Sequence, residues 1–197
     1  MKKFQKIALP SLVILLSFAF TSEKPTVYNV DTSASSIVWT GKKVTGEHTG
    51  NISVANGNLE MDGNKVTGGS FEIDMSSITC TDLSGGTAEK LLGHLKSDDF
   101  FGVANHGTAN LKITKAVWQG ENNYKITGDL TIKGTTKEIK FPATIAEDGG
   151  KVTANATIVV DRTEYDIRYG SGSFFDNLGD KTIYDDFTLE VSLVANN

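Results

Sequence analysis

The sequence predicts an all-β protein whose antiparallel strands form a sandwich or an up-and-down barrel. Apolar and polar residues alternate in short runs from about residue 26 onward, which is typical of strands with one buried and one solvent-facing side. Turn sequences separate these runs, among them Asn56-Gly57, Asp62-Gly63, residues 120–123 and residues 148–150. Strand and turn together recur about every 10 to 15 residues, a spacing expected of both architectures.

The alternation is clearest over residues 71–76, 124–133 and 187–193. A sheet with one apolar face must cover that face, either by packing against a second sheet or by closing on itself. A closed barrel of about eight strands has an interior wide enough for side chains or for one ligand. The alternation leaves a filled core and a ligand cavity as open alternatives.

Residues 87–96 break the alternation and predict a short helix. Their apolar residues fall on roughly one helical face: Ala88, Leu91, Leu92 and Leu95. Thr87 is placed to cap the start of this helix, and Gly93 weakens it. Two adjacent phenylalanines, Phe100 and Phe101, follow shortly after the helix.

The first 21 residues predict a cleaved signal peptide ahead of one domain at residues 22–197. Three lysines precede an uncharged apolar stretch over residues 7–20, and small residues then allow cleavage after Ala19 or Thr21. An uncleaved membrane anchor is the open alternative, although the stretch is shorter than the roughly 20 residues of a typical span. The cleavage region contains no cysteine, which excludes a lipoprotein anchor. We therefore expect a periplasmic or extracellular protein with no stable membrane span in its mature chain.

The charge of the mature chain argues against nucleic-acid binding. Removing the three lysines of the leader from the 19 basic residues leaves 16 against 24 acidic ones, a net charge near −8. Nucleic acids and anionic membranes both require clustered Lys and Arg, and the longest basic run is Lys42-Lys43. The single cysteine, Cys80, allows no internal disulfide, so the core and its hydrogen bonds must stabilise the fold.

The sequence offers no motif for catalysis or for metal binding. The three histidines, His48, His94 and His106, lack metal-ligand spacing, and we interpret them as exposed side chains. A GxSxG nucleophile motif is missing, and abundant carboxylates do not by themselves indicate a glycosidase. We therefore predict no catalytic residues, no metal and no cofactor.

Several short segments, in this order, resemble one family of secreted proteins. The similarity runs from about Tyr28 to Ala195. It is carried by residues 38–43, 46–50, 68–78, 90–101, 128–137 and 161–163. No single segment is specific, but their order is that of the YceI-like family of polyisoprenoid-binding proteins, which the chain resembles.

The resemblance implies an antiparallel, lipocalin-like β-barrel with a long isoprenoid, such as a quinone tail or polyprenyl compound, in its interior. The protein is then a lipid carrier or scavenger and not an enzyme, with a homodimer as an open possibility. One departure concerns the loop after Phe101, where the family often has a tyrosine–proline pair and this chain has Asn105-His106-Gly107. The alternative functions are an interaction or adhesion sandwich with a filled core and a metal-dependent enzyme.

If the barrel holds a lipid, its inward apolar residues are the candidate ligand contacts. These are Trp39, Phe71, Ile73, Met75, Ile126, Leu130, Ile132, Ile139, Phe141, Ile158, Phe187 and Leu189. Each buried CH₂ group contributes roughly 0.8 kcal/mol before the costs of association, so a long chain binds without polar contacts. Ordinary core packing is the alternative role for each of these residues.

A second group of candidate contacts lies near the expected mouth: Leu91, Leu92, Leu95, Phe100 and Phe101. They form either a lid or a helix that plugs one end of the barrel. Arg162 is expected in a strand whose neighbours are apolar, and a charged side chain there needs a partner. It either forms a structural bridge with Asp74 or Asp161 or recognises a ligand head group.

Overall fold

The structure is a computed structural model that describes residues 24–197. The predicted signal peptide and its cleavage site lie outside the described residues. The described chain forms nine strands: β1 (Thr26–Val30), β2 (Ser36–Lys43), β3 (Gly46–Asp62), β4 (Lys65–Asp74), β5 (Thr108–Gly120), β6 (Asn123–Ile132), β7 (Thr135–Asp148), β8 (Lys151–Asp161) and β9 (Ile183–Asn196).

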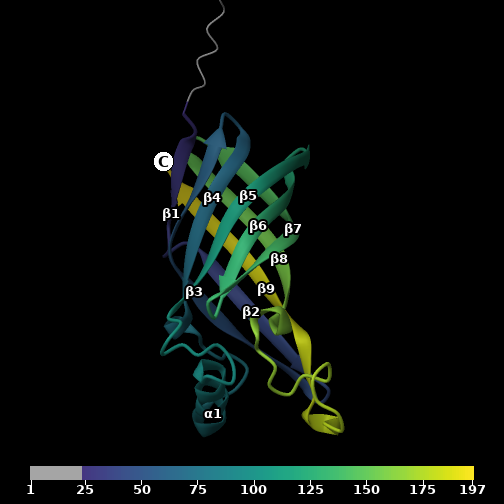
Figure 1. The fold of residues 1–197 in the computed structure, drawn as a ribbon. Helices are drawn as coiled ribbons and strands as arrows, with labels where there is room; N and C mark the ends of the chain where they lie inside the picture. The colour runs from purple at the N-terminus through teal and green to yellow at the C-terminus, as the bar shows by residue number, and fades with distance from the viewer. Residues whose placement is uncertain (1–23) are drawn as a thin grey trace, which may run out of the picture.

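The strands β2 to β9 close into an eight-stranded antiparallel barrel (Figure 1). Neighbouring strands follow the order β3-β2-β9-β8-β7-β6-β5-β4, and β4 then pairs with β3 to close the ring. The short strand β1 pairs with β3 and with β9, beyond the start of β2. The predicted antiparallel barrel of about eight strands is confirmed, and the chain does not adopt the sandwich.

A β-bulge on β3 changes which of its residues face the interior. The register of β3 against β4 shifts between Val54 and Asn56. The buried residues are Ile52 and Val54 before the shift, and Leu59 and Met61 after it. An extra residue in one strand moves the later side chains to the opposite face. A similar shift occurs in β5 against β6.

Three of the predicted turns connect strands, and one does not. Residues 62–63 lie in the β3–β4 hairpin, residues 120–123 in the β5–β6 hairpin and residues 148–150 in the β7–β8 hairpin. Asn56-Gly57 lies inside β3 beside the bulge, so the prediction of a turn there is wrong. Glycine at position 57 makes room for an inward ring, because a Cβ there would lie 2.8 Å from Cδ1 of Phe71.

The predicted helix is present as α1 (Gly85–Lys96), which starts slightly earlier than expected. Thr87 therefore lies inside the helix, and Ser84 occupies the N-cap position without a capping side-chain hydrogen bond, so the predicted cap is wrong. Three short 3-10 helices complete the structure: η1 (Met75–Ser77), η2 (Arg162–Tyr165) and η3 (Gly179–Lys181). Over residues 24–197, no helix combines the length and the hydropathy that crossing a bilayer requires.

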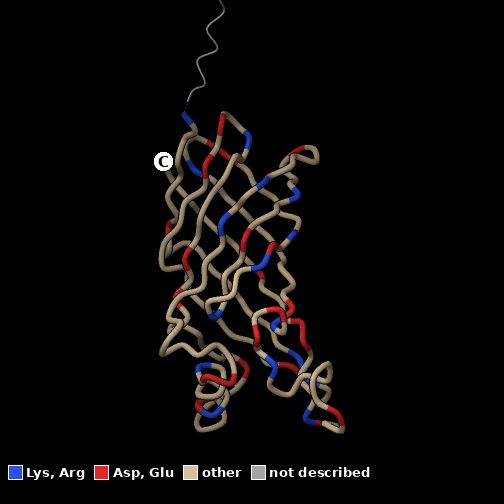
Figure 2. Tube along the Cα trace, viewed as in Figure 1, with Lys and Arg blue, Asp and Glu red and all other residues tan. Residues whose placement is uncertain are grey.

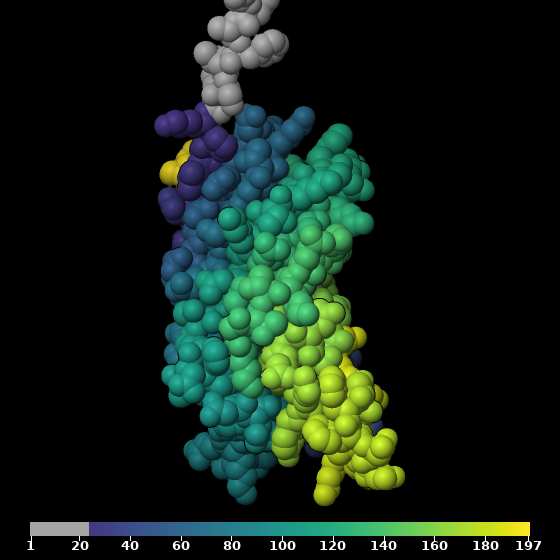
Figure 3. Space-filling model, viewed as in Figure 1, coloured from purple at the N-terminus to yellow at the C-terminus, as the bar shows by residue number. Residues whose placement is uncertain are grey.

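The irregular segments gather at one end of the barrel, which we call the mouth. The α1 segment and residues 162–182 extend beyond the strands at this end (Figures 1 and 3). The opposite end, which we call the sealed end, carries the β3–β4, β5–β6 and β7–β8 hairpins and the C-terminus. Acidic and basic residues are interspersed along the outside of the barrel (Figure 2).

The chain leading into α1 is fastened to β3 and β2 at Thr79. Its backbone N–H donates to the carbonyl of Asn51 at 2.9 Å, and its own carbonyl accepts from Nε1 of Trp39 at 2.9 Å. A Cβ on Gly50 would lie 1.8 Å from that carbonyl oxygen, so only glycine permits this approach. The wall and the mouth are thus joined by specific backbone contacts.

Candidate ligand-binding cavity

The interior of the barrel contains an apolar cavity in two parts along its axis. The part nearer the mouth has a volume of about 120 Å³, and the part nearer the sealed end about 100 Å³. Ile37, Ile73, Leu130 and Leu189 line both parts, so these residues form a waist between them. Both volumes lie below the roughly 300–1,000 Å³ of a typical small-molecule pocket.

The walls of both parts of the cavity are apolar. The side chains that line the inner part are apolar, and Asn155, which borders it, is exposed on the outer face of β8. Four polar or charged residues border the outer part: Arg162, which is buried, and Lys42, Tyr184 and Asp186, which are exposed at its edge. The polar groups nearest the cavity therefore lie at its mouth end.

Inward side chains of β9 remain partly accessible although strands surround them. Leu189, Val191 and Leu193 line the cavity, yet each is only half-buried. Their neighbours do not fill the centre of the barrel, since a packed core leaves few voids larger than a water molecule. Of the two alternatives that the alternation left open, the structure therefore has the cavity.

Most of the predicted ligand contacts line this cavity. From the walls these are Trp39, Phe71, Ile73, Met75, Ile126, Leu130, Ile132, Ile139, Phe141, Ile158, Phe187 and Leu189, and from the mouth Leu95, Phe100, Phe101 and Arg162. Leu91 and Leu92 do not line the cavity. They lie earlier in α1 than Leu95 and pack against other core residues. Contact with a ligand remains a prediction for all of them.

Sequence reasoning missed another set of lining residues. They include Ile37, Ile52, Val54, Leu59, Ala109, Leu111, Ile113, Ile145, Val191 and Leu193. Val191 and Leu193 continue the alternation of β9 and were detectable by the same signal. The residues on β3 and β5 flank the bulges, where a strict period of two no longer identifies the inner face.

An aromatic cluster covers the mouth. The ring centroid of Phe100 lies 5.9 Å from that of Phe101, which in turn lies 6.2 Å from that of Phe187. The ring of His94 contacts Phe100 at 5.2 Å and Tyr169 at 4.3 Å, joining the α1 segment to residues 162–182. Of the helix itself only Leu95, in its last turn, reaches the cavity. The loop after the helix therefore covers the opening, and the helix does not plug the barrel.

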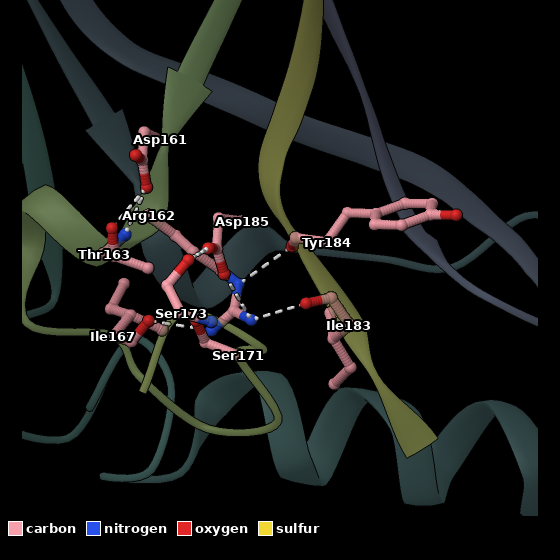
Figure 4. A network of polar contacts seen from close by, with 9 residues as sticks. All are labelled: Asp161, Arg162, Thr163, Ile167, Ser171, Ser173, Ile183, Tyr184 and Asp185. Carbon is pink, nitrogen blue, oxygen red and sulfur yellow. Dashed lines mark hydrogen bonds and ion pairs between the residues drawn. The ribbon is translucent and has the colours of Figure 1, made fainter. Parts of the chain in front are cut away.

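Arg162 is buried at the mouth and serves as the centre of a polar network (Figure 4). Its Nε donates to the carbonyl of Tyr184 at 3.1 Å, and its Nη1 donates to the carbonyl of Ile167 at 2.7 Å. Its Nη2 donates to the carbonyl of Ile183 at 3.1 Å and to Oδ1 of Asp185 at 3.4 Å. Of its five N–H groups, four are therefore engaged by η2, its following loop and β9.

The expected environment and partners of Arg162 were wrong. The residue lies in η2 rather than in a strand, and its ion pair is with Asp185. Asp161 accepts from the backbone N–H of Thr163, and Asp74 caps η1. Asp185 lies on β9, so its approach to Arg162 depends on closure of the barrel and leaves no local signal in the sequence.

The pKa values of Arg162 and Asp185 are both lowered, which disfavours the charged form of the arginine and favours that of the aspartate. Burial lowers the pKa of Arg162, partly offset by the nearby charges of Asp185 and Asp161. Burial opposes ionisation of Asp185 as well, but hydrogen bonds from serines and the Arg162 charge bring its pKa below the usual value. The guanidinium also lies over the ring of Phe100, 5.5 Å from its centroid. The same residue thus ties the mouth together and faces the cavity.

The histidines are less exposed than expected, and they do not form a metal site. His48 and His94 are half-buried, and Nδ1 of His48 lies 2.8 Å from Oδ2 of Asp82. Among residues 24–197, no group of three or more His, Cys, Asp or Glu side chains is placed to hold a metal ion. We therefore take the apolar cavity inside the barrel as the candidate binding site.

A family model described as the YceI-like domain matches residues 28–195. The chain belongs to the YceI-like family. Its sequence relatives include a UPF0312 protein of Ectopseudomonas mendocina, 41% identical over 56 residues that cover 28% of this chain and 29% of that protein. A UPF0312 protein of Shewanella denitrificans is 29% identical over 100 residues, covering 51% of this chain and 50% of that protein. The chain thus spans half the length or less of these relatives.

Solved structures share the barrel. BcnA of Burkholderia cenocepacia superposes with a TM-score of 0.68 at 23% identity, covering 85% of this chain and 99% of that one. A polyisoprenoid binding domain from Saccharophagus degradans gives a TM-score of 0.64 at 15% identity, covering 86% of this chain and 97% of that one. Because both identities are low, these similarities establish that the chain shares the fold of the two proteins and nothing about its ligand.

Proposed function

We propose that this YceI-like protein binds one long-chain isoprenoid lipid, a quinone or polyprenyl compound, in its barrel and carries it outside the cytoplasm. The observation that carries the proposal is the apolar cavity, which runs in two parts from the aromatic cluster at the mouth past the waist. Family membership and the polyisoprenoid binding domain of similar fold support the same ligand class. The apolar, charge-free leader over residues 7–20 supports export.

The two cavity parts must widen to accept such a ligand. Together they hold less than a typical small-molecule pocket, and the waist residues Ile37, Ile73, Leu130 and Leu189 separate them. We infer that the chain of the ligand displaces the inward side chains of β9, which are only half-buried. Its polar end then lies near Arg162, where one N–H of Nη1 has no partner among the described residues.

The composition of the inner cavity favours binding over catalysis. Its lining, within the described residues, contains no ionisable side chain that would serve as a general acid, base or nucleophile. Burial of apolar surface is therefore the interaction that this part of the site offers. An interaction module with a filled core, the main alternative, is harder to reconcile with partly accessible residues in the centre of the barrel.

The test is organic extraction of the purified protein followed by mass spectrometry of the extract. We expect a long-chain isoprenoid in stoichiometric amount. Ala156→Phe fills the inner cavity from β8 and should abolish retention of the lipid, while leaving the fold intact because it adds apolar volume to an open space. Val159→Phe, on the outer face of the same strand, is the matched control and should retain it.

Absence of any lipid in the extract, together with an unchanged thermal midpoint after addition of polyprenyl compounds, would contradict the proposal. Equal retention by Ala156→Phe and Val159→Phe would also contradict it, since the lipid would then lie elsewhere. The interaction module would become the preferred function in either case.

A further inference from the structure

One loop at the mouth presents three aromatic rings to solvent. Tyr169 is 47% exposed, Phe174 is 46% exposed and Phe175 is 51% exposed. Large apolar side chains occur singly on protein surfaces, but a cluster of this kind marks an interaction site. We call residues 168–175 the aromatic loop. Over residues 24–197, no other segment carries three exposed large apolar side chains; Val117 and Trp118 form a pair on β5.

The aromatic loop borders the opening of the cavity. The ring of Tyr169 lies 4.3 Å from the ring of His94 and 6.2 Å from that of Phe100, which lines the cavity. The backbone N–H of Ile183, another lining residue, donates to the carbonyl of Gly170 at 2.8 Å. The loop belongs to the 162–182 segment, which projects past the strand ends (Figures 1 and 3). A surface that meets the mouth therefore also meets these rings.

The backbone of the aromatic loop is held in place, although its rings are exposed. Ser171 is fully buried, and its carbonyl accepts from the backbone N–H groups of Phe174 and Phe175 at 3.2 and 3.0 Å. Oγ of Ser173 donates to Asp185 of the Arg162 network at 2.6 Å. Anchoring of this kind fixes the direction of the rings outward. The guanidinium of Arg168 lies 4.7 Å from the ring centroid of Phe174 and adds a cation beside the rings.

The charge around the loop restricts the surface that it can meet. Residues 162–186 contain six Asp and Glu residues but only three Lys and Arg residues (Figure 2). Arg162 and Arg168 are already paired, with Asp185 and Asp166. An anionic bilayer is bound by clustered cations, so the segment 162–186 does not suit one. Tyrosine instead favours the interface of a bilayer, where its apolar ring and its hydroxyl are both accommodated, and phenylalanine rings bury apolar surface there.

We propose that the aromatic loop inserts Tyr169, Phe174 and Phe175 into the surface of a zwitterionic phospholipid bilayer and thereby places the mouth against the membrane. The inference rests on the proposed function, because a carrier of a membrane lipid must meet the bilayer at the end through which its cargo passes. The occupant is thus a neutral lipid surface, and a second copy of the chain or another protein is an outcome of the test.

The experiment is co-sedimentation of residues 24–197, which contain every strand of the barrel, with phosphatidylcholine vesicles. Leaving out residues 1–23 removes the membrane affinity of the apolar leader. The variant Phe174→Ser/Phe175→Ser is compared with Val117→Ser/Trp118→Ser, which removes exposed apolar side chains from β5 and is the matched control. We expect the vesicle partition coefficient to fall at least about tenfold in the first variant, since two rings lose apolar burial, and to stay unchanged in the control.

Three results would overturn the proposal: no sedimentation of the parent chain, equal sedimentation of both variants, or sedimentation only when phosphatidylglycerol is added. A dimer that dissociates in the Phe174→Ser/Phe175→Ser variant, without vesicle binding by the parent chain, would assign the loop to self-association instead. Mass spectrometry of lipid extracts separates this test from that of the proposed function. The loop variant should retain its lipid, whereas a parent chain that holds no lipid before or after incubation with polyprenyl compounds contradicts the carrier function whatever the vesicles show.

Discussion

The two ends of the barrel are closed in different ways. At the sealed end, side chains from regular strands fill the interior, and Met61 and Val152 are each only 1% exposed. Tyr124 on β6 reaches across to the β3–β4 hairpin, where its hydroxyl donates to the carbonyl of Asn64 at 2.9 Å. At the mouth the cover comes from the loop after α1 and from residues 162–182, held by ring contacts and by Arg162.

This difference indicates where the molecule can open. Opening the sealed end requires separation of paired strands, because its buried residues lie in the ladders of β3 and β8. Opening the mouth requires only displacement of irregular segments that contact one another through a few side chains. Local opening is favoured where such contacts are few, so we expect ligand exchange at the mouth.

The largest effect is expected from Arg162→Ala at the mouth. The change leaves the carbonyls of Ile167, Ile183 and Tyr184 without their donor and removes the ion pair with Asp185. We expect the free energy of unfolding, measured by urea denaturation, to fall by about 3 kcal/mol, as when a buried ion pair loses one partner. Arg168→Ala removes an exposed pair and should cost about 0–1 kcal/mol; equal losses in the two variants would show that the network does not hold the mouth.

A second pair of variants separates stability from exchange. Met61→Ala at the sealed end and Phe100→Ala at the mouth each remove a buried apolar side chain and should each cost about 2–5 kcal/mol. Only Phe100→Ala should also accelerate transfer of a bound lipid to acceptor vesicles, measured as a transfer rate. Faster transfer from the Met61→Ala variant would contradict the assignment of the mouth.

Tyr124→Phe tests the polar contact of the sealed end alone. The change removes the hydrogen bond to Asn64 but keeps the buried ring. The free energy of unfolding should fall by about 1 kcal/mol, the usual net value of one hydrogen bond, with lipid transfer unchanged. A loss below the error of the denaturation curve would mean that the hydroxyl contributes nothing to closure.

The smallest effect is the loss of stability in acid that Asp82, in the chain leading into α1, contributes. Hydrogen bonds from His48, Thr49 and Cys80 outweigh burial and lower the pKa of Asp82 from 3.8 to about 2. A carboxyl group whose pKa is lowered by folding contributes stability above pH 3.8, and this contribution is lost as the pH falls toward 2. Denaturation curves across this range should show a smaller decline for Asp82→Asn than for the parent chain. Identical declines would remove Asp82 from the acid response.

The sequence predicted the barrel because its main signal is local. A period of two identifies the inner face wherever a strand is regular, and Ile126, Leu130 and Ile132 on β6 line the cavity as expected. The same rule failed on β3, where the extra residue of the bulge beside Val54 changes which side chains face the interior. The dipeptide Asn56-Gly57, which is typical of a turn, belongs to this bulged part of the strand. The position of a bulge depends on pairing with the neighbouring strand, which a single segment does not reveal.

The mouth was predicted less well because its contacts are long-range. Leu91 and Leu92 share a helical face with Leu95, but the depth at which the helix sits decides that only Leu95 reaches the cavity. Arg162 was correctly singled out as a charge that needs a partner. Its partner Asp185 could not be chosen over Asp74 or Asp161 without knowing that β9 returns beside β8.

The central claim is that the barrel interior holds one long-chain lipid, and native mass spectrometry of the purified protein tests it most directly. The account predicts a complex heavier than the bare chain by the mass of one isoprenoid lipid. It predicts the same complex for Val159→Phe and only the bare chain for Ala156→Phe. A bare parent chain, before and after incubation with polyprenyl compounds, would contradict the account.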